Sequence, residues 1–332
     1  MIRPCKGPPG DICQEKAPMS SAYPIDQGAQ VAATPPGLLF RVRRSRWGYL
    51  FVSPWVILYL FFGLYPLILS FYLTFFNYSF VTPENRTFVG IGNWVNGATD
   101  PLFWKALYNI LLNQTTFIIL KNGLGLITAA LLFRITWGAR LFRTIYFLPV
   151  ITSTVVLMTI GDNLASPAGP IQTILINAGL LSGPVFWKLD NTLPMIIIAI
   201  INTWKWFGIS TIILLAGMYG IDPRLYEAAV VDGAKGRELF RYITLPMLRP
   251  QLFFLLVVDI INGLQMFTEV YAIGFNVYGG IDHQALTPVL YLYAQAFDRS
   301  NVGYASTLGL LLAFLIALFT ALQFKFVRSD ID

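Results

Sequence analysis

Long apolar blocks constrain this chain more than any other feature of its sequence. A membrane hydrocarbon core about 30 Å thick requires roughly 20 predominantly apolar residues per helix. Blocks of that length recur here between charged or turn residues, and the whole chain is 56% hydrophobic and only 12% charged. We therefore predict an all-α, polytopic membrane protein. Its six transmembrane helices are expected at about 47–76, 103–133, 141–161, 193–218, 250–274 and 304–326.

The basic residues of the connecting segments predict the orientation of these helices. Most of them lie before the first block, between the second and third, between the fourth and fifth, and after the sixth. The opposite segments hold Arg86, Lys105, Lys188 and Arg299. Because cytoplasmic loops carry an excess of Lys and Arg, both termini and the loop at 219–249 are expected to be cytoplasmic. The basic residues form no continuous basic face, which argues against a nucleic-acid partner.

The first 45 residues differ in composition from the rest. They are rich in Pro and Gly and are expected to form a disordered cytoplasmic tail ahead of a transmembrane domain at 46–328. Cys5 and Cys13, the only cysteines, lie in this tail. With His283 as the single histidine, they indicate neither a disulfide framework nor a metal site. Met19 is as plausible a start as Met1, and the sequence leaves that choice open.

One motif stands in the loop between the fourth and fifth blocks. Glu227-Ala228-Ala229 is followed at fixed spacing by Gly233, and then by the I-x-L-P pattern at 243–246. This loop resembles the signature loop of permease subunits of binding-protein-dependent ABC importers, in the carbohydrate-uptake branch that includes maltose and glycerol-3-phosphate permeases. Similar stretches at 88–94, 143–149 and 202–204 extend the resemblance to about 45–328, although 274–280 lacks a proline that is frequent in the family. The resemblance implies the type I importer permease fold.

The residues of the motif predict a short exposed helix at 222–237. Asp222 and Pro223 suit a helix start, and Gly233 can end a helix. In the family this helix docks into a cleft of the ATPase subunit, where two small residues allow close approach and a carboxylate meets basic groups. An amphipathic helix that only joins two spans is the alternative. The resemblance assigns ATPase coupling to Tyr226, Glu227, Ala228, Ala229, Asp232, Gly233, Ala234, Ile243, Leu245 and Pro246.

The energy source must be another polypeptide. The chain has no phosphate-binding loop of the form G-x-x-x-x-G-K followed by Ser or Thr, so it is expected to be no enzyme and to bind no cofactor, while ATP and Mg are used by a partner ATPase. The resemblance implies a second homologous permease, two ATP-binding subunits, an external solute-binding protein, a sugar substrate and surrounding lipid. It also implies a bacterial or archaeal cytoplasmic membrane.

The predicted spans contain charged residues, each of which costs about 3 kcal/mol unless it is paired or faces water. Those considered as functional candidates are Lys121, Lys205, Asp259 and Glu269. For Lys121, pairing or snorkelling is as good an interpretation as a functional role. Glu269 lies near the external end of its block, where water can reach it.

The resemblance also indicates a solute site. Asp259 lies thirteen residues after Pro246, and Gly263 lies one helical turn further; positions with these offsets contact sugar in maltose-type permeases. The segment around Asn202 matches a family segment that contributes to the same site. The predicted substrate-binding residues are therefore Asn202, Lys205, Trp206, Asp259 and Gly263, with packing against the partner permease as the alternative for each.

Other functions remain to be weighed beside sugar import. Within the family, glycerol-3-phosphate or a glycerophosphodiester is the nearest alternative solute. From a different class, an ion-coupled secondary transporter could use Asp259 and Lys121 as a charge relay. Such a transporter has no use for an ATPase-docking helix, so the motif argues against it. A membrane scaffold would not need charges at mid-depth.

Overall fold

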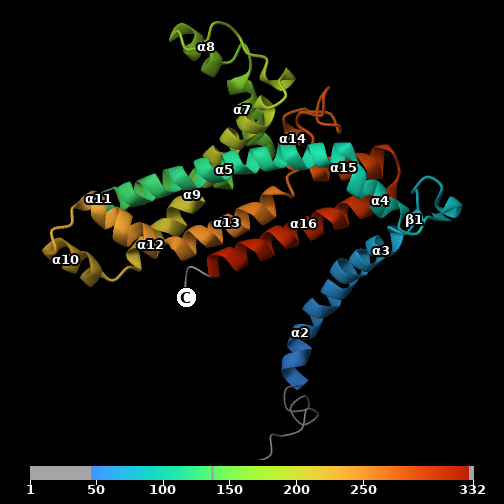
Figure 1. Ribbon diagram of the computed structural model, residues 1–332, viewed down its shortest axis with the longest axis horizontal. Helices are drawn as coiled ribbons and strands as arrows, with labels where there is room; N and C mark the ends of the chain where they lie inside the picture. Colours follow the sequence, from blue (N-terminus) through green and yellow to red (C-terminus); the bar gives the residue numbers. More distant parts are fainter. Residues whose placement is uncertain (1–45, 136–137, 329–332) are drawn as a thin grey trace, which may run out of the picture. The chain divides into compact units, whose positions relative to one another are not determined.

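The computed structural model describes residues 46–135 and 138–328, and helices make up most of it (Figure 1). The all-α prediction is therefore confirmed, with one short pair of strands as the exception. The expected tail at 1–45, with both cysteines and Met19, lies outside the described residues. The chain divides into two compact units, residues 1–60 and 61–332.

The described element of the first unit is helix α2 (Arg46–Tyr59). Residues 48–59 are apolar almost throughout, and none of their side chains is buried. Trp55 and Tyr59 stack on each other along the same helix face, with ring centroids 5.5 Å apart. A helix that is apolar on all sides and buries none of its described side chains is suited to lipid or to a neighbouring membrane subunit.

The second unit holds the remaining elements, which begin within the π-helical turn η1 (Leu60–Leu64). Strands β1 and β2 pair antiparallel, with Phe76 opposite Phe88. The elements are α3 (Tyr65–Leu73), β1 (Phe76–Asn77), η2 (Pro83–Asn85), β2 (Thr87–Phe88), α4 (Gly92–Thr99), α5 (Pro101–Arg134), α6 (Ala139–Ile151), α7 (Thr154–Ala165), α8 (Pro170–Asn177), η3 (Trp187–Leu189), α9 (Leu193–Tyr219), α10 (Pro223–Val231), α11 (Gly236–Leu239), η4 (Phe240–Thr244), α12 (Leu245–Met247), α13 (Arg249–Gly263), α14 (Thr268–Ala272), α15 (Pro288–Tyr293), η5 (Ala294–Asp298) and α16 (Val302–Arg328).

Four helices in the described part of the chain are long and apolar enough to cross a membrane. They correspond to the first, second, fourth and sixth predicted blocks: Gly48–Leu73, Pro101–Arg134, Leu193–Tyr219 and Val302–Lys325. Two bent pairs, Leu141–Ile151 with Thr154–Asn177 and Gly236–Met247 with Arg249–Gly263, raise the number to six if each pair forms one span. The six-span topology with both termini in the cytoplasm therefore stays a prediction.

Two of the predicted blocks are not the unbroken helices that we expected. In the third, the chain bends by 97° between α6 and α7, because Thr152 and Ser153 take extended ψ angles of 141° and 134°. In the fifth, α13 ends at Gly263 instead of continuing to 274. There the N–H groups of Gln265 and Met266 bond back to the carbonyls of Asn262 and Gly263 and turn the chain, which is consistent with the weak helix propensity of glycine.

The core of the second unit forms where α5 packs along α9 (Figure 1). Small residues bring the backbones together. A Cβ on Gly125 of α5 would lie 2.6 Å from the Cβ of Ser210 on α9, and a Cβ on Gly208 would lie 2.1 Å from the backbone oxygen of Tyr146 on α6. The hydroxyls of Thr128 and Thr211 also meet across the α5–α9 contact, 2.6 Å apart. Close approach at small residues is typical of helix packing in membranes.

The two ends of α5 contact different parts of the chain. At its N-terminal end, Asp100 caps the helix and accepts hydrogen bonds from Tyr291 of α15 (2.6 Å) and from Tyr304 near the start of α16 (2.5 Å). At its C-terminal end, the Arg134 side chain lies beside Gly236 of α11. The motif loop therefore gathers at one end of α5 and the loops predicted to be external at the other, which agrees with the orientation that the basic residues predict.

Candidate functional site

A cavity of about 500 Å³ lies in the second unit among α5, α9, α13 and α14. Asn202, Trp206, Asp259 and Gly263, four of the five predicted substrate-binding residues, line it. Although they come from two helices far apart in sequence, the fold brings them to one place. Its polar lining consists of Gln114, Lys121, Asn202, Asp259, Asn262 and Glu269.

Lys205, the fifth predicted residue, does not line this cavity. Its side chain is buried, and its ammonium group donates a hydrogen bond to Thr154 Oγ1 (2.5 Å), at the start of α7. The same ammonium group lies 5.2 Å from the ring centroid of Trp206. Lys205 thus stands behind the cavity wall and covers one face of an aromatic ring that forms it.

A buried ion pair forms the polar centre of the cavity wall. Lys121 Nζ contacts Asp259 Oδ1, and both side chains are almost fully buried. Asn122 Nδ2 donates to the second carboxylate oxygen (3.2 Å), and Ser210 Oγ donates to Asn122 Oδ1 (2.9 Å). A buried charge is tolerated only when it is paired and hydrogen-bonded, and this network meets both conditions for Asp259.

The carboxylate of Asp259 is already hydrogen-bonded within the chain, which differs from the role predicted for it. We expected its carboxylate to accept hydrogen bonds from solute hydroxyls, but both of its oxygens already accept hydrogen bonds from the chain's own donors, Lys121 and Asn122. Pairing, one of the two interpretations for Lys121, is what the structure shows. Contact between Asp259 and a solute stays a prediction.

Two amide side chains of the cavity lining have buried oxygen atoms without a hydrogen-bond partner among the described residues. These atoms are Asn202 Oδ1 and Gln114 Oε1, and each residue is 4% exposed. Gln114 owes its position to Gly263, since a Cβ there would lie 2.0 Å from the Gln114 carboxamide. Buried polar atoms in native structures are almost always hydrogen-bonded, so unpartnered acceptors in a cavity wall indicate a ligand or bound water.

The sequence did not indicate three polar residues of the site: Gln114, which lines the cavity, and Asn122 and Ser210, which belong to the hydrogen-bond network of Asp259. Uncharged amides and hydroxyls are tolerated in membrane helices, so they give little signal by themselves. A helical spacing argument could have found one of them. Gln114 and Lys121 lie seven residues apart on α5, two helical turns, and therefore share a face.

The motif helix α10 is the second candidate site. Asp222 accepts a hydrogen bond from Arg224 N (3.0 Å), and Pro223 occupies the first turn, as predicted. The predicted extent of 222–237 is wrong, because the helix ends at Val231. Gly233 has a φ of 88°, and the N–H groups of Gly233 and Ala234 bond to the carbonyls of Val230 and Ala229. This is a Schellman ending, which closes the helix.

The ten predicted coupling residues form an exposed surface and its support. Glu227, Ala228, Asp232 and Gly233 are exposed. The Tyr226 hydroxyl lies 2.9 Å from Thr244 Oγ1 and so ties α10 to η4. The remaining five, Ala229, Ala234, Ile243, Leu245 and Pro246, are half-buried. Leu225, Val230 and Val231 leave apolar side chains exposed on or beside the same surface, which is typical of a docking site for another protein.

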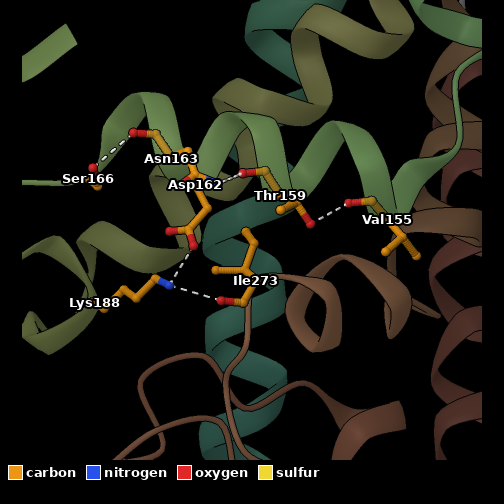
Figure 2. Close-up of polar contacts among 7 residues, drawn as sticks. All are labelled: Val155, Thr159, Asp162, Asn163, Ser166, Lys188 and Ile273. Atoms are coloured by element: carbon orange, nitrogen blue, oxygen red, sulfur yellow. Dashed lines mark hydrogen bonds and ion pairs between the residues drawn. The ribbon is translucent and has the colours of Figure 1, made fainter. Parts of the chain in front are cut away.

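A second ion pair lies at the end predicted to be external. Lys188 Nζ contacts Asp162 Oδ2 on α7 (2.8 Å) and donates to the backbone oxygen of Ile273 beside α14 (2.9 Å), as Figure 2 shows. Both charged side chains are partly exposed, unlike those of the buried pair. The pair joins α7, η3 and the end of α14. Within the described ranges, no three His, Cys, Asp or Glu side chains are grouped to hold a metal ion.

Known transport proteins resemble this chain over most of its length. Residues 121–329 match the family described as "Binding-protein-dependent transport system inner membrane component". The chain is 32% identical to the lactose transport system permease protein LacF of Rhizobium radiobacter, over 85% of this chain and 94% of the relative. It is 34% identical to the arabinooligosaccharides transport system permease protein AraP of Bacillus subtilis, over 85% of this chain and 88% of the relative.

A solved structure shares the fold. It belongs to a bacterial alginate ABC transporter in complex with an alginate pentasaccharide-bound periplasmic protein. The match has a TM-score of 0.73 at 21% identity and covers 88% of this chain and 98% of the other. The likeness in fold agrees with the importer permease architecture that the motif predicts.

Proposed function

The chain belongs to the binding-protein-dependent transport system inner membrane components, and we propose that within this family it carries a sugar or oligosaccharide across a bacterial or archaeal cytoplasmic membrane. The family is a membrane component of transport systems rather than an enzyme. The observation that carries the proposal is the convergence of the predicted site residues of α9 and α13 on one cavity.

The lining of this cavity suits a sugar. Amide oxygens of Gln114 and Asn202 can accept hydrogen bonds from hydroxyl groups. Phe117, Trp206 and Phe254 add aromatic surface, which packs against the apolar faces of sugar rings. Ligand pockets typically measure about 300–1,000 Å³, and this cavity falls within that range. Relatives named for lactose and arabinooligosaccharides support the same solute class.

The connection from the motif helix α10 to the cavity supports coupled transport. Tyr226 of α10 contacts Thr244, the last residue of η4. From there the chain continues through α12 into α13, which carries Asp259 and Gly263, and a bend of 57° lies between the two helical segments. A displacement of α10 by an ATPase would thus be transmitted through the contact between Tyr226 and Thr244, and then across the bend that precedes α13, to the cavity wall.

The proposal includes partners. A second, homologous permease would complete the pathway. Two ATP-binding subunits would hold α10 and the corresponding helix of that permease, and an external solute-binding protein would deliver the solute. The likeness to a transporter solved with a periplasmic protein supports the last of these. The buried pair of Lys121 and Asp259 keeps the ion-coupled alternative in view, but the family membership favours ATP as the energy source.

Uptake into proteoliposomes tests this function. The assembled complex, supplied with its solute-binding protein, should accumulate a labelled neutral oligosaccharide only when ATP is present on the α10 side. Ionophores that collapse ion gradients should leave the rate unchanged. Uptake that follows an ion gradient and ignores ATP would contradict the proposal and favour the secondary transporter.

A further inference from the structure

The cavity presents hydrogen-bond acceptors whose own partners are missing. Asn202 Oδ1 and Gln114 Oε1 are buried and have no hydrogen-bond partner in the described ranges. Glu269 adds a carboxylate to the lining and takes part in neither ion pair of the described chain. An unsatisfied buried acceptor is costly, so a ligand that donates hydrogen bonds to these atoms would recover that energy.

The positive charge at the cavity is already compensated. Lys121 is the one cation among the lining residues that the structure describes, and its ammonium group is paired with Asp259. Lys205 stands outside the lining, bound to Thr154 and covering the ring of Trp206. An incoming anion would therefore find no unpaired ammonium or guanidinium group among the described lining residues, and would approach the carboxylate of Glu269.

We propose that this cavity selects uncharged polyhydroxylated solutes and rejects anionic ones such as sugar phosphates and uronates. The inference rests on the proposed transport role and specifies its substrate class. Hydroxyl groups donate to the unpartnered amide oxygens. A phosphate or carboxylate group only accepts, needs cationic or N–H donors, and is repelled by carboxylates at close range where the dielectric constant is low. Within the family, this separates sugar import from glycerol-3-phosphate import.

Binding to the permease complex without its external solute-binding protein tests this selection. Saturation-transfer NMR titrations of the purified complex would compare matched pairs, trehalose with trehalose 6-phosphate and lactose with lactose 6-phosphate. The neutral member of at least one pair should bind about tenfold or more tightly than its phosphate, which corresponds to about 1.4 kcal/mol. Replacement of Asn202 by Leu should weaken that binding, which would place it in the cavity.

Charge variants make the inference sharper. Asp259→Asn frees the ammonium group of Lys121, and Glu269→Gln removes the other lining carboxylate, so each should raise the affinity for the phosphate relative to the neutral sugar. Where Asp259→Asn prevents assembly, Glu269→Gln carries the test. The matched control is Asp162→Asn, which frees Lys188 in the exposed pair outside the cavity (Figure 2) and should leave the ratio unchanged.

Several outcomes would overturn the inference. Equal or tighter binding of the phosphates to the unaltered complex would contradict it, as would a ratio that Asp259→Asn and Glu269→Gln do not shift. Binding of no solute would refute the cavity as a selective site. ATP-driven uptake of a neutral oligosaccharide, measured separately, would then still support the transport role, so the two failures are distinguishable.

Discussion

The cavity wall and the motif helix differ in how their polar and apolar groups are satisfied. In the wall, Lys121 and Asp259 form a buried pair, and the half-buried Asn122 and the buried Ser210 extend it into a hydrogen-bond network. On α10, by contrast, apolar side chains are left exposed to solvent; that of Val231 is 88% exposed. The wall is therefore built to hold its shape around a small solute, whereas the surface of α10 is suited to another protein. Substitutions in the two regions should fail in different ways.

The largest effect is expected from breaking the buried pair on one side only. Asp259→Leu leaves the ammonium group of Lys121 buried and uncompensated, which should cost about 3–5 kcal/mol of stability. The double replacement of Lys121 by Met and Asp259 by Leu should recover most of that loss, because no buried charge remains. Thermal unfolding of the detergent-solubilised complex measures both. A double variant as unstable as the single one would show that the charge is not the cause.

A substitution at Gly233 should disturb coupling more than folding. Its φ of 88° lies in the left-handed region, which costs a residue with a side chain about 1–2 kcal/mol, yet no atom lies within 4 Å of an added Cβ. Gly233→Val should therefore uncouple ATP hydrolysis from uptake while the complex still assembles. Gly309→Ala, in α16 with equally open surroundings, is the matched control. Normal uptake by Gly233→Val would weaken the docking assignment.

A smaller and more local effect is expected at Gly263. A Cβ added at Gly263 would lie only 2.0 Å from the Gln114 carboxamide. Because the carboxamide is the flexible end of a side chain, it would move aside. Gly263→Ala should weaken solute binding by up to about tenfold, or about 1.4 kcal/mol, with assembly near normal. Gly208→Ala provides the contrast, since its added Cβ meets a backbone oxygen and should lower stability instead. Unchanged binding in Gly263→Ala would remove Gln114 from the site.

The smallest effect is expected at the exposed ion pair. Lys188 and Asp162 are partly exposed to solvent (Figure 2), and such pairs contribute about 0–1 kcal/mol. Asp162→Asn should shift the unfolding temperature slightly, and less so at high salt. A loss comparable to that of Asp259→Leu would mean that burial does not separate the two pairs.

Much of the site could be predicted from the sequence, but its partners could not. The motif and its offsets singled out Asp259 and Gly263, which line one cavity, and Gly233, which follows the end of α10. Solute contact by Asp259 and Gly263 stays a prediction. The contact between Lys121 and Asp259 joins residues 138 positions apart. Charges inside the predicted spans indicate that partners are needed, but one sequence does not show which charges meet.

Lys205 shows where helical geometry could have corrected the prediction. Successive residues of an α-helix are rotated by about 100°, so Lys205 and Trp206 project in different directions while Asn202 and Trp206 share a face. The structure follows this geometry, with Asn202 and Trp206 on the cavity and Lys205 on Thr154. The bends at Thr152 and Gly263 were missed because hydropathy records the length of an apolar block and not its continuity as a helix.

A structure of the assembled complex with a bound neutral oligosaccharide tests the central claim most directly. We predict solute hydroxyls within hydrogen-bond distance of Asn202 Oδ1 and Gln114 Oε1, an intact pair of Lys121 and Asp259, and α10 bound in a cleft of an ATP-binding subunit. A solute bound away from α9 and α13, or held by Asp259 with Lys121 released, would contradict it.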